Sequence, residues 1–251
     1  MNKSLRDVQL IMLDMLKEVD MILKKHDISY VLLGGSVLGA VRHGGFIPWD
    51  DDIDIGILRK DFSKAERIFS SLEKYVYESS EKHIIPDGPC AHLHLVNDEF
   101  SLENSPTLDF FPIDKVPSVE SKKQRRKFML WANIHHVSVL RRPPYNRGKL
   151  KKVVIGFPIK LTLKKIIALI QMYSLNKILS MQIHGEKWLG NIWQGEKEFF
   201  PEHIYLDTVL MKFENGEFPV PKAWDVYLKS LYGDYMALPP VEARKPLHKS
   251  Y

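Results

Sequence analysis

The feature that most constrains this chain is a stretch in which a glycine pair and a run of carboxylates flank a short helical segment. It spans residues 30–61 and reads YVLLGGSVLGAVRHGGFIPWDDDIDIGILRKD. Apolar residues lead into Gly34-Gly35-Ser36, and an acidic cluster at residues 50–54 leads into a run of isoleucines. Phosphate chemistry needs backbone amides for anionic oxygens and closely spaced carboxylates for a divalent cation. This stretch offers both.

The acidic half of the stretch predicts a strand that carries two carboxylates on one face. Side chains alternate along a strand, so Asp52 and Asp54 project together, while the isoleucines at 53, 55 and 57 point into a core. Neighbouring carboxylates repel each other unless a cation holds them, and Mg²⁺ or Mn²⁺ takes such oxygen ligands. A solvated turn is the alternative, but a turn does not explain the alternation with isoleucine.

The glycine half predicts a strand, a tight turn and a helix start. Gly34 and Gly35 permit backbone conformations that are closed to other residues. Ser36 is predicted to cap the helix, with its hydroxyl facing a ligand, and amides at a helix start attract phosphate. A glycine pair is by itself more often a plain turn, so its weight comes from the acidic strand that follows.

Length and charge bound the remaining possibilities. At 251 residues the chain can form one domain with an extension or two small domains. Its net charge of +5 favours anionic partners such as nucleotides, phosphorylated glycans or an acidic membrane surface. Cys90 is the only cysteine, which excludes an internal disulfide and a thiolate zinc knuckle. The sequence has no signal-peptide core and no apolar membrane span, so we expect a cytoplasmic protein.

Flanking patterns predict the scaffold. Residues 4–26 form an amphipathic helix with a Ser4–Asp7 capping box, and Asp61 is predicted to cap a second helix over residues 62–74. Strands are expected at residues 29–33, 75–79 and 92–96. In the last of these His92 and His94 share a face, either as metal ligands or, as we favour, as a solvated or phosphate-facing surface.

A second acidic position lies in the segment PTLDFFPID, residues 106–114. Asp109 stands between Leu108 and Phe110, so it lies alone on the opposite face of an apolar strand. A buried, unpaired carboxylate is costly, and a role as third metal ligand beside Asp52 and Asp54 removes that cost. Asp114 is predicted to end the strand in a turn.

The C-terminal part adds basic and aromatic groups. Residues 149–173 combine an apolar stripe with lysines, which fits either a helix on an anionic membrane or a core-packed helix. A hairpin is expected around Asn215-Gly216, followed by a helix over residues 224–232. Tyr232 and Tyr235 can form a cation–π cage for a quaternary ammonium or, as we favour, pack against the core, whereas Arg244 suits a phosphate.

Three motifs together resemble one family. GGSVLGAVRHGGFIPWDDDIDIGILRKDF is followed by LDFFPIDKVP and, near the end, by FPVPKAWDVYLKSLYGDYMALPPVEARKPLH. Their order and content resemble the LicD family, and the stretch from the first motif to the last spans most of the chain. The resemblance implies an α+β fold, with a nucleotidyltransferase-like mixed β-sheet flanked by helices and a mostly helical C-terminal extension. We expect a single LicD-type domain, with a core at 1–120 and a substrate-binding or membrane-facing extension at 121–251.

The resemblance also assigns roles to individual residues. Asp52, Asp54 and Asp109 match its catalytic, metal-binding carboxylates, and Gly35 with Ser36 matches its phosphate turn, which Gly34 begins. Val37 stands where many relatives have threonine, which leaves the backbone cradle intact. The remaining expected donor-binding positions are Arg42, which suits bidentate phosphate contact, Asp50, which orients the ligands or Trp49, and Tyr232, Tyr235 and Arg244.

By this resemblance we expect Mg²⁺- or Mn²⁺-dependent transfer of phosphocholine, or a related phosphoalcohol, from CDP-choline or another CDP-alcohol. The acceptor is a hydroxyl of a cell-surface glycan, such as teichoic acid, capsule or lipopolysaccharide, or of its lipid-linked precursor, and CMP leaves. The alternatives are nucleotidyl transfer with pyrophosphate release and a noncatalytic, metal-dependent nucleotide or glycan binder. The chain has neither a Walker-type phosphate loop nor a sequence-specific nucleic-acid motif. An inner-membrane peripheral position is expected if the basic helix meets lipid.

Overall fold

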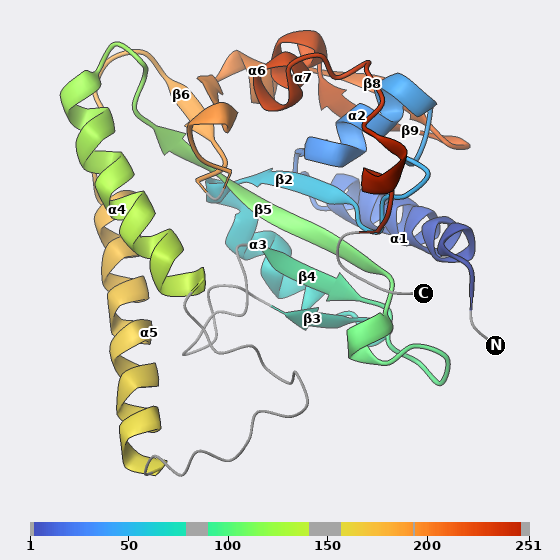
Figure 1. Cartoon of the computed structure of the whole chain (residues 1–251), viewed down its shortest axis with the longest axis horizontal. Helices are drawn as coiled ribbons and strands as arrows, with labels where there is room; N and C mark the ends of the chain where they lie inside the picture. The colour runs from blue at the N-terminus through green and yellow to red at the C-terminus, as the bar shows by residue number, and fades with distance from the viewer. Residues whose placement is uncertain (1–2, 79–89, 141–156, 193, 247–251) are drawn as a thin grey trace.

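The computed structural model describes residues 3–78, 90–140, 157–192 and 194–246. Its core is a mixed β-sheet with helices packed around it, which confirms the expected α+β class (Figure 1). A helical hairpin stands at one side of the sheet, and a two-stranded ribbon lies at the opposite end of the molecule. The prediction for residues 149–156 lies outside the described residues.

The main sheet is organised around its longest strand, β5. The strand order is β1-β2-β5-β4-β3, and β5 also pairs with β6, which pairs with β7. The β2–β5 pair is parallel, and every other described pair is antiparallel. The strands are β1 (Tyr30–Leu32), β2 (Asp54–Leu58), β3 (Val76–Glu78), β4 (Ala91–His94), β5 (Thr107–Val116), β6 (Trp188–Gly190) and β7 (Phe199–Pro201).

Amphipathic helices bury the core of the N-terminal part. Helix α1 (Leu5–Lys25) begins with the predicted Ser4–Asp7 capping box and packs on β5. Helix α3 (Arg59–Phe69) packs on β2 and β5. The isoleucines at 53, 55 and 57 are fully buried, as their alternation predicted. Helix α2 (Gly34–His43) connects the end of β1 to the acidic cluster.

The C-terminal part contains strands as well as the expected helices. Helices α4 (Lys122–Leu140) and α5 (Phe157–Leu179) form the hairpin at the left of Figure 1 and share a small second core with β6 and β7. The predicted hairpin is present as β8 (Thr208–Phe213) and β9 (Gly216–Pro221). The remaining elements are η1 (Leu102–Asn104), η2 (Gly195–Glu198), α6 (His203–Leu206), α7 (Trp224–Tyr232) and η3 (Val241–Ala243).

Three local predictions were wrong. Ser36 is not a helix cap, because α2 already begins at Gly34 after Leu33. Asp61 lies inside the first turn of α3, since that helix begins at Arg59. Asp114 does not end its strand: it is buried within β5, where Arg59 Nε donates to its Oδ1 at 2.7 Å. A long-range ion pair, which local patterns do not reveal, explains the buried carboxylate.

No helix among the described residues is long and apolar enough to cross a membrane.

Candidate active site

Strand pairing places three polar side chains in one row across the sheet. Asp54 of β2 stands opposite Asp109 of β5, and Asp109 stands opposite His92 of β4. Directly paired residues point to the same side of a sheet, so the three side chains share a face. Asp52 stands two positions before Asp54, and Cys90 stands two positions before His92. Asp52 itself lies just before β2 rather than within it.

The carboxylates of Asp52, Asp54 and Asp109 converge. One oxygen of each lies within 4.8 Å of the others, which is a separation that one divalent cation can bridge. The loss of hydration and the facing carboxylates of Asp52 and Asp109 raise the pKa of Asp54 well above its ordinary value. Desolvation and Asp52 raise the pKa of Asp50 to about 8. An all-oxygen donor set with this much repulsion fits Mg²⁺ or Mn²⁺, because a cation offsets the repulsion.

The start of α2 lies directly against these carboxylates. Gly34 has a positive φ of 48°, and a Cβ there would lie 2.7 Å from Asp54 Oδ2. A Cβ on Gly35 would lie 2.8 Å from Asp50 Oδ2. The hydroxyl of Ser36 accepts a hydrogen bond from the backbone N–H of Asp54 at 2.9 Å, so Ser36 fixes the start of β2 instead of capping the helix. Only glycine leaves room for this approach.

Two residues that sequence reasoning missed support the glycine turn from below. The Gly34 amide donates to the hydroxyl of Tyr227 at 3.0 Å, and this hydroxyl donates to Glu198 Oε1 at 3.0 Å. Glu198 is buried, with 1% of its surface exposed, and desolvation raises its pKa to about 7. No local pattern marks Glu198, because its partners lie far away in the sequence.

Two of the predicted donor-binding residues, Arg42 and Arg244, bring positive charge to the region between α2 and the C-terminal segment. Arg42 Nη1 donates to the backbone carbonyls of Tyr235 at 2.8 Å and Ala237 at 3.3 Å, and so ties α2 to the C-terminal segment. Arg244 lies over the ring of Trp49, 5.7 Å from its centroid. The Arg42 pKa is lowered by desolvation and also by Arg244, which places the two guanidinium groups within electrostatic reach of each other.

Tyr232 and Tyr235, for which we favoured packing over a cation–π cage, have different surroundings. The Tyr232 hydroxyl would lie 3.6 Å from a Cβ on Gly34, and desolvation, with the nearby Asp54, raises the Tyr232 pKa. Tyr235 is buried and its hydroxyl donates to Asp225 at 2.7 Å. The packing alternative therefore describes Tyr235, whereas the Tyr232 hydroxyl lies beside the carboxylates.

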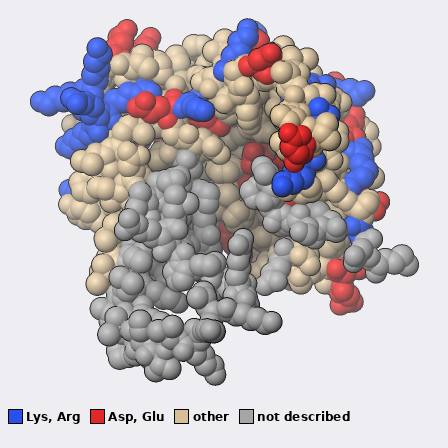
Figure 2. Space-filling model, in the orientation of Figure 1, with Lys and Arg blue, Asp and Glu red and all other residues tan. Residues whose placement is uncertain are grey.

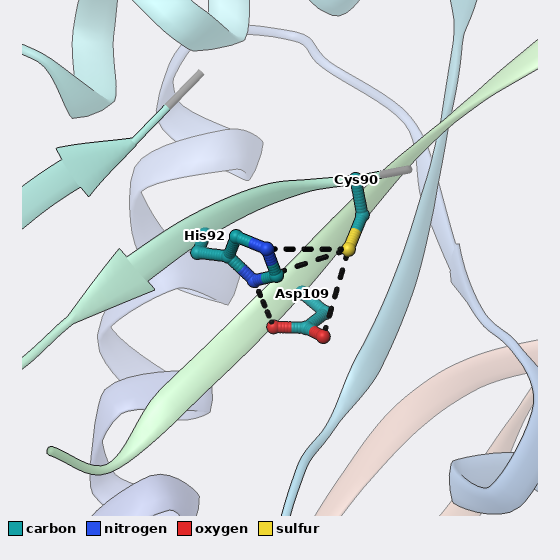
Figure 3. Close-up of side chains that lie close together, drawn as sticks. All are labelled: Cys90, His92 and Asp109. Atoms are coloured by element: carbon teal, nitrogen blue, oxygen red, sulfur yellow. Dashed lines mark hydrogen bonds and ion pairs between the residues drawn. The ribbon is translucent and has the colours of Figure 1, made fainter. Parts of the chain in front are cut away.

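The two histidines of β4 have different surroundings. His92 Nδ1 lies 2.8 Å from Asp109 Oδ1, and Cys90 Sγ donates to Asp109 Oδ2 at 3.6 Å (Figure 3). His94 is only 7% exposed, and its Nδ1 contacts the hydroxyls of Ser105 and Thr107. The favoured expectation of a solvated surface is therefore wrong for His94. The alternation of residues 92–96 predicted that the two histidines lie on a strand. Only the strand register shows that His92 lies opposite Asp109.

Comparison with known proteins identifies relatives of this chain. The family model described as LicD/FKTN/FKRP, nucleotidyltransferase domain, matches residues 27–141, which include the glycine turn and all three carboxylates. The lipopolysaccharide cholinephosphotransferase LicD of Haemophilus influenzae is 28% identical over 270 aligned residues, which cover 98% of this chain and 96% of that protein.

A shorter similarity reaches animal proteins. The ribitol 5-phosphate transferases FKRP of mouse and human are each 47% identical over 47 residues, or 19% of this chain and 10% of theirs. An uncharacterised protein of Rickettsia prowazekii is 36% identical over 87 residues, or 34% of this chain and 33% of that protein.

Proposed function

Since the chain belongs to the LicD family, we propose that it transfers phosphocholine, or a related phosphoalcohol, from a CDP-linked donor to a hydroxyl of a glycan. The acceptor in this proposal is a cell-surface glycan or its lipid-linked precursor. CMP is the leaving group, and the reaction takes place on the cytoplasmic side of the membrane. The activities for which two relatives are named, cholinephosphate transfer and ribitol 5-phosphate transfer, support this class of reaction.

One observation carries the proposal: three carboxylates converge beside a glycine turn at a helix start. Oxygens of Asp52, Asp54 and Asp109 lie within 4.8 Å of one another. Gly34 and Gly35 let the start of α2 approach the carboxylates of Asp54 and Asp50. A noncatalytic binder has no need to gather three carboxylates at such a place, because their mutual repulsion costs stability.

The chemistry is a displacement at phosphorus. The acceptor oxygen forms a bond to the phosphorus that carries choline, and the bond from this phosphorus to the bridging oxygen of the CDP group breaks. Asp52, Asp54 and Asp109 would hold Mg²⁺ or Mn²⁺, which when bound offsets charge on the donor phosphates and on CMP. In this proposal Asp109 also takes the acceptor proton, and its position on the strand between the other carboxylates and His92 supports that role.

The two guanidinium groups of Arg42 and Arg244 suit the donor diphosphate. Arg244 over Trp49 and the nearby Arg42 bring two guanidinium groups to the side of α2 that faces the C-terminal segment. Guanidinium groups bind phosphate with directional, charge-assisted hydrogen bonds. In this proposal Arg42 and Arg244 orient the donor, and Tyr232 contacts the transferred phosphoalcohol near the carboxylates.

The decisive experiment measures CMP release from a panel of CDP-choline, CDP-glycerol and CDP-ribitol, with glycan acceptor and Mg²⁺. Asp52→Asn and Asp54→Asn are expected to reduce turnover by roughly a thousandfold or more, as loss of a metal-binding or electrostatic group does. Asp207→Asn changes an exposed carboxylate and serves as the matched control. Near-normal turnover in Asp52→Asn would contradict the site assignment.

The same assay separates the alternatives. Release of pyrophosphate from CTP, with no CMP from any CDP-alcohol, would identify a nucleotidyltransferase. Tight Mg²⁺-dependent binding of CDP-alcohols without turnover would identify a binding protein. Both outcomes would overturn phosphoalcohol transfer.

The helical hairpin supports a further part of the proposal, namely contact with a membrane that carries a lipid-linked acceptor. Helix α5 exposes Leu169, Met172 and Tyr173, each more than half accessible to solvent. Figure 2 shows Lys and Arg side chains gathered at the upper left, over the start of α4, where Lys122, Lys123, Arg126 and Lys127 are exposed. An apolar face with flanking cations matches the chemistry of an anionic lipid surface.

A further inference from the structure

A second cluster of potential metal ligands lies beside the carboxylate triad and shares one residue with it. Figure 3 shows Cys90, His92 and Asp109 pointing toward one another from adjacent strands. One ligand atom of each lies within 4.8 Å of the others. The backbone builds this arrangement, because His92 of β4 pairs directly with Asp109 of β5, and Cys90 stands two positions before His92, immediately ahead of β4. The cluster is therefore fixed by strand register.

The distances within this cluster suit a small tetrahedral cation. Cys90 Sγ lies 3.6 Å from Asp109 Oδ2 and 3.7 Å from His92 Nε2. In a zinc site with a Zn–S bond of about 2.3 Å and Zn–N and Zn–O bonds of about 2.0 Å, tetrahedral angles set the ligand atoms roughly 3.3–3.6 Å apart. The shorter 2.8 Å contact between His92 Nδ1 and Asp109 Oδ1 is a hydrogen bond, which fixes the orientation of both groups.

The donor chemistry differs from that of the neighbouring triad. Asp52, Asp54 and Asp109 offer only carboxylate oxygens, which Mg²⁺ prefers, whereas a thiolate and an imidazole select softer ions such as Zn²⁺. Cys90 is 3% exposed, so a cation bound to its sulfur would be shielded from water on that side. The fourth tetrahedral position stays open to water or to a substrate oxygen, as three protein ligands leave it.

We propose that Cys90, His92 and Asp109 form a second cation site, selective for Zn²⁺ or a similar borderline-soft ion, which shares Asp109 with the oxygen triad. Binding replaces the thiol proton, which passes to solvent, with a metal–sulfur bond and involves no change of oxidation state. The site goes beyond the proposed transfer reaction and does not depend on it. Because one carboxylate serves both clusters, occupation of one site alters the affinity of the other.

Cobalt is the probe for the test, because Co²⁺ replaces Zn²⁺ and a cobalt–thiolate bond gives a characteristic near-ultraviolet charge-transfer absorption. The full chain is stripped with a chelator and titrated with Co²⁺ without added Mg²⁺. Since Cys90 is the only cysteine, any thiolate absorption reports on this residue. We expect a band that saturates at one equivalent and disappears when Zn²⁺ is added.

Variants locate the other ligands. His92→Ala is expected to weaken Co²⁺ binding by at least about tenfold, and Cys90→Ser to abolish the band. His203→Ala removes an exposed histidine and is the matched control, with binding unchanged. Asp52→Asn is expected to keep the band, which separates this site from the oxygen triad and from the transfer activity.

The wild-type titration alone can overturn the proposal, whatever the stability of the variants. Absence of a thiolate band at Co²⁺ concentrations that saturate the protein would do so. A band that needs a large excess of Co²⁺, or that His92→Ala leaves at full affinity, would also contradict the site.

Discussion

At the scale of single residues, the site depends on a glycine that lets a carboxylate approach the helix start and on buried side chains that hold this glycine in place. Gly34 lies so close to Asp54 that any side chain would displace the carboxylate. Glu198 and Tyr227 fill the space beneath the same glycine and hold its amide. The turn thus acts through its backbone, which side chains from distant segments hold in place.

Gly34→Ala is expected to reduce transfer roughly a hundredfold, because it pushes Asp54 away from the position it needs. Gly44→Ala is the matched control: Gly44 also has a positive φ, 68°, but a Cβ there meets nothing within 4 Å. Both variants carry a backbone cost of about 1 kcal/mol. Steady-state turnover and urea unfolding measure the two effects, and equal turnover in both variants would show that crowding at Gly34 is unimportant.

Glu198→Gln is expected to stabilise the protein by an amount that grows as the pH rises from the unfolded to the folded pKa of Glu198, with little effect at acidic pH. Burial raises the Glu198 pKa from 4.5 to about 7, so the folded state favours the protonated form. Stability from this group is complete below the unfolded pKa and is lost as the pH rises through the folded pKa. Glutamine stays neutral and can still accept from Tyr227. We expect a gain of about 1–3 kcal/mol above pH 7 and little change near pH 4.

Chemical denaturation of the wild type and of Glu198→Gln at the two pH values checks this sign. Glu217→Gln, at an exposed position of β9, is the control and should change stability at neither pH. A gain of equal size at both pH values would mean that Glu198 is not desolvated in the folded protein.

At the scale of elements, the register between β2, β5 and β4 assembles the site. A shift of β5 by one residue would turn Asp109 to the other face of the sheet and remove it from the row. The buried pair of Arg59 and Asp114 lies further along β5 and links this strand to the start of α3. Asp114, which the sequence predicted to end the strand, thus holds β5, the strand that carries Asp109, to the start of α3.

The α4–α5 hairpin is predicted to bind anionic vesicles through its exposed apolar residues. Leu169→Asp together with Met172→Asp should reduce co-sedimentation with vesicles at least about tenfold, because burial of each side chain in lipid is worth about 1.5–3 kcal/mol. Leu210→Asp, an exposed leucine on β8, is the matched control. Binding should weaken as salt increases. Unchanged sedimentation of the double variant would rule this surface out.

At the scale of the whole molecule, the N-terminal and C-terminal parts complete one site. Helix α7 supplies Tyr227 to Gly34, and the segment after it accepts hydrogen bonds from Arg42. At the opposite end, Glu214 of the β8–β9 turn pairs with Arg6 and accepts from the Phe46 amide. A division of the chain at residue 120 remains a prediction, and these contacts predict that residues 1–120 alone would lose the support of the glycine turn.

Mg²⁺ is predicted to stabilise the whole protein through the carboxylate triad. At a hundredfold excess over its Kd the gain is about 2.7 kcal/mol, measured as a rise in Tm. Asp52→Asn removes one source of the repulsion that raises the Asp54 pKa, so the variant should match or exceed the wild type without metal and gain little with it. Asp207→Asn should follow the wild type in both conditions. A wild type whose Tm ignores Mg²⁺ would contradict metal binding at the triad.

The resemblance to one family implied the α+β class, and the sequence by itself determined the first helix with its cap, the buried isoleucines and the acidic positions at 52, 54 and 109. These follow from patterns within a few residues, because helix and strand periods are local. Tertiary structure alone decided that Asp114 is paired, that Ser36 holds Asp54 rather than capping a helix, and that Glu198, Tyr227, His92 and Cys90 adjoin the site. Their partners lie tens to hundreds of residues away, so strand register and packing, which no local pattern encodes, bring them together.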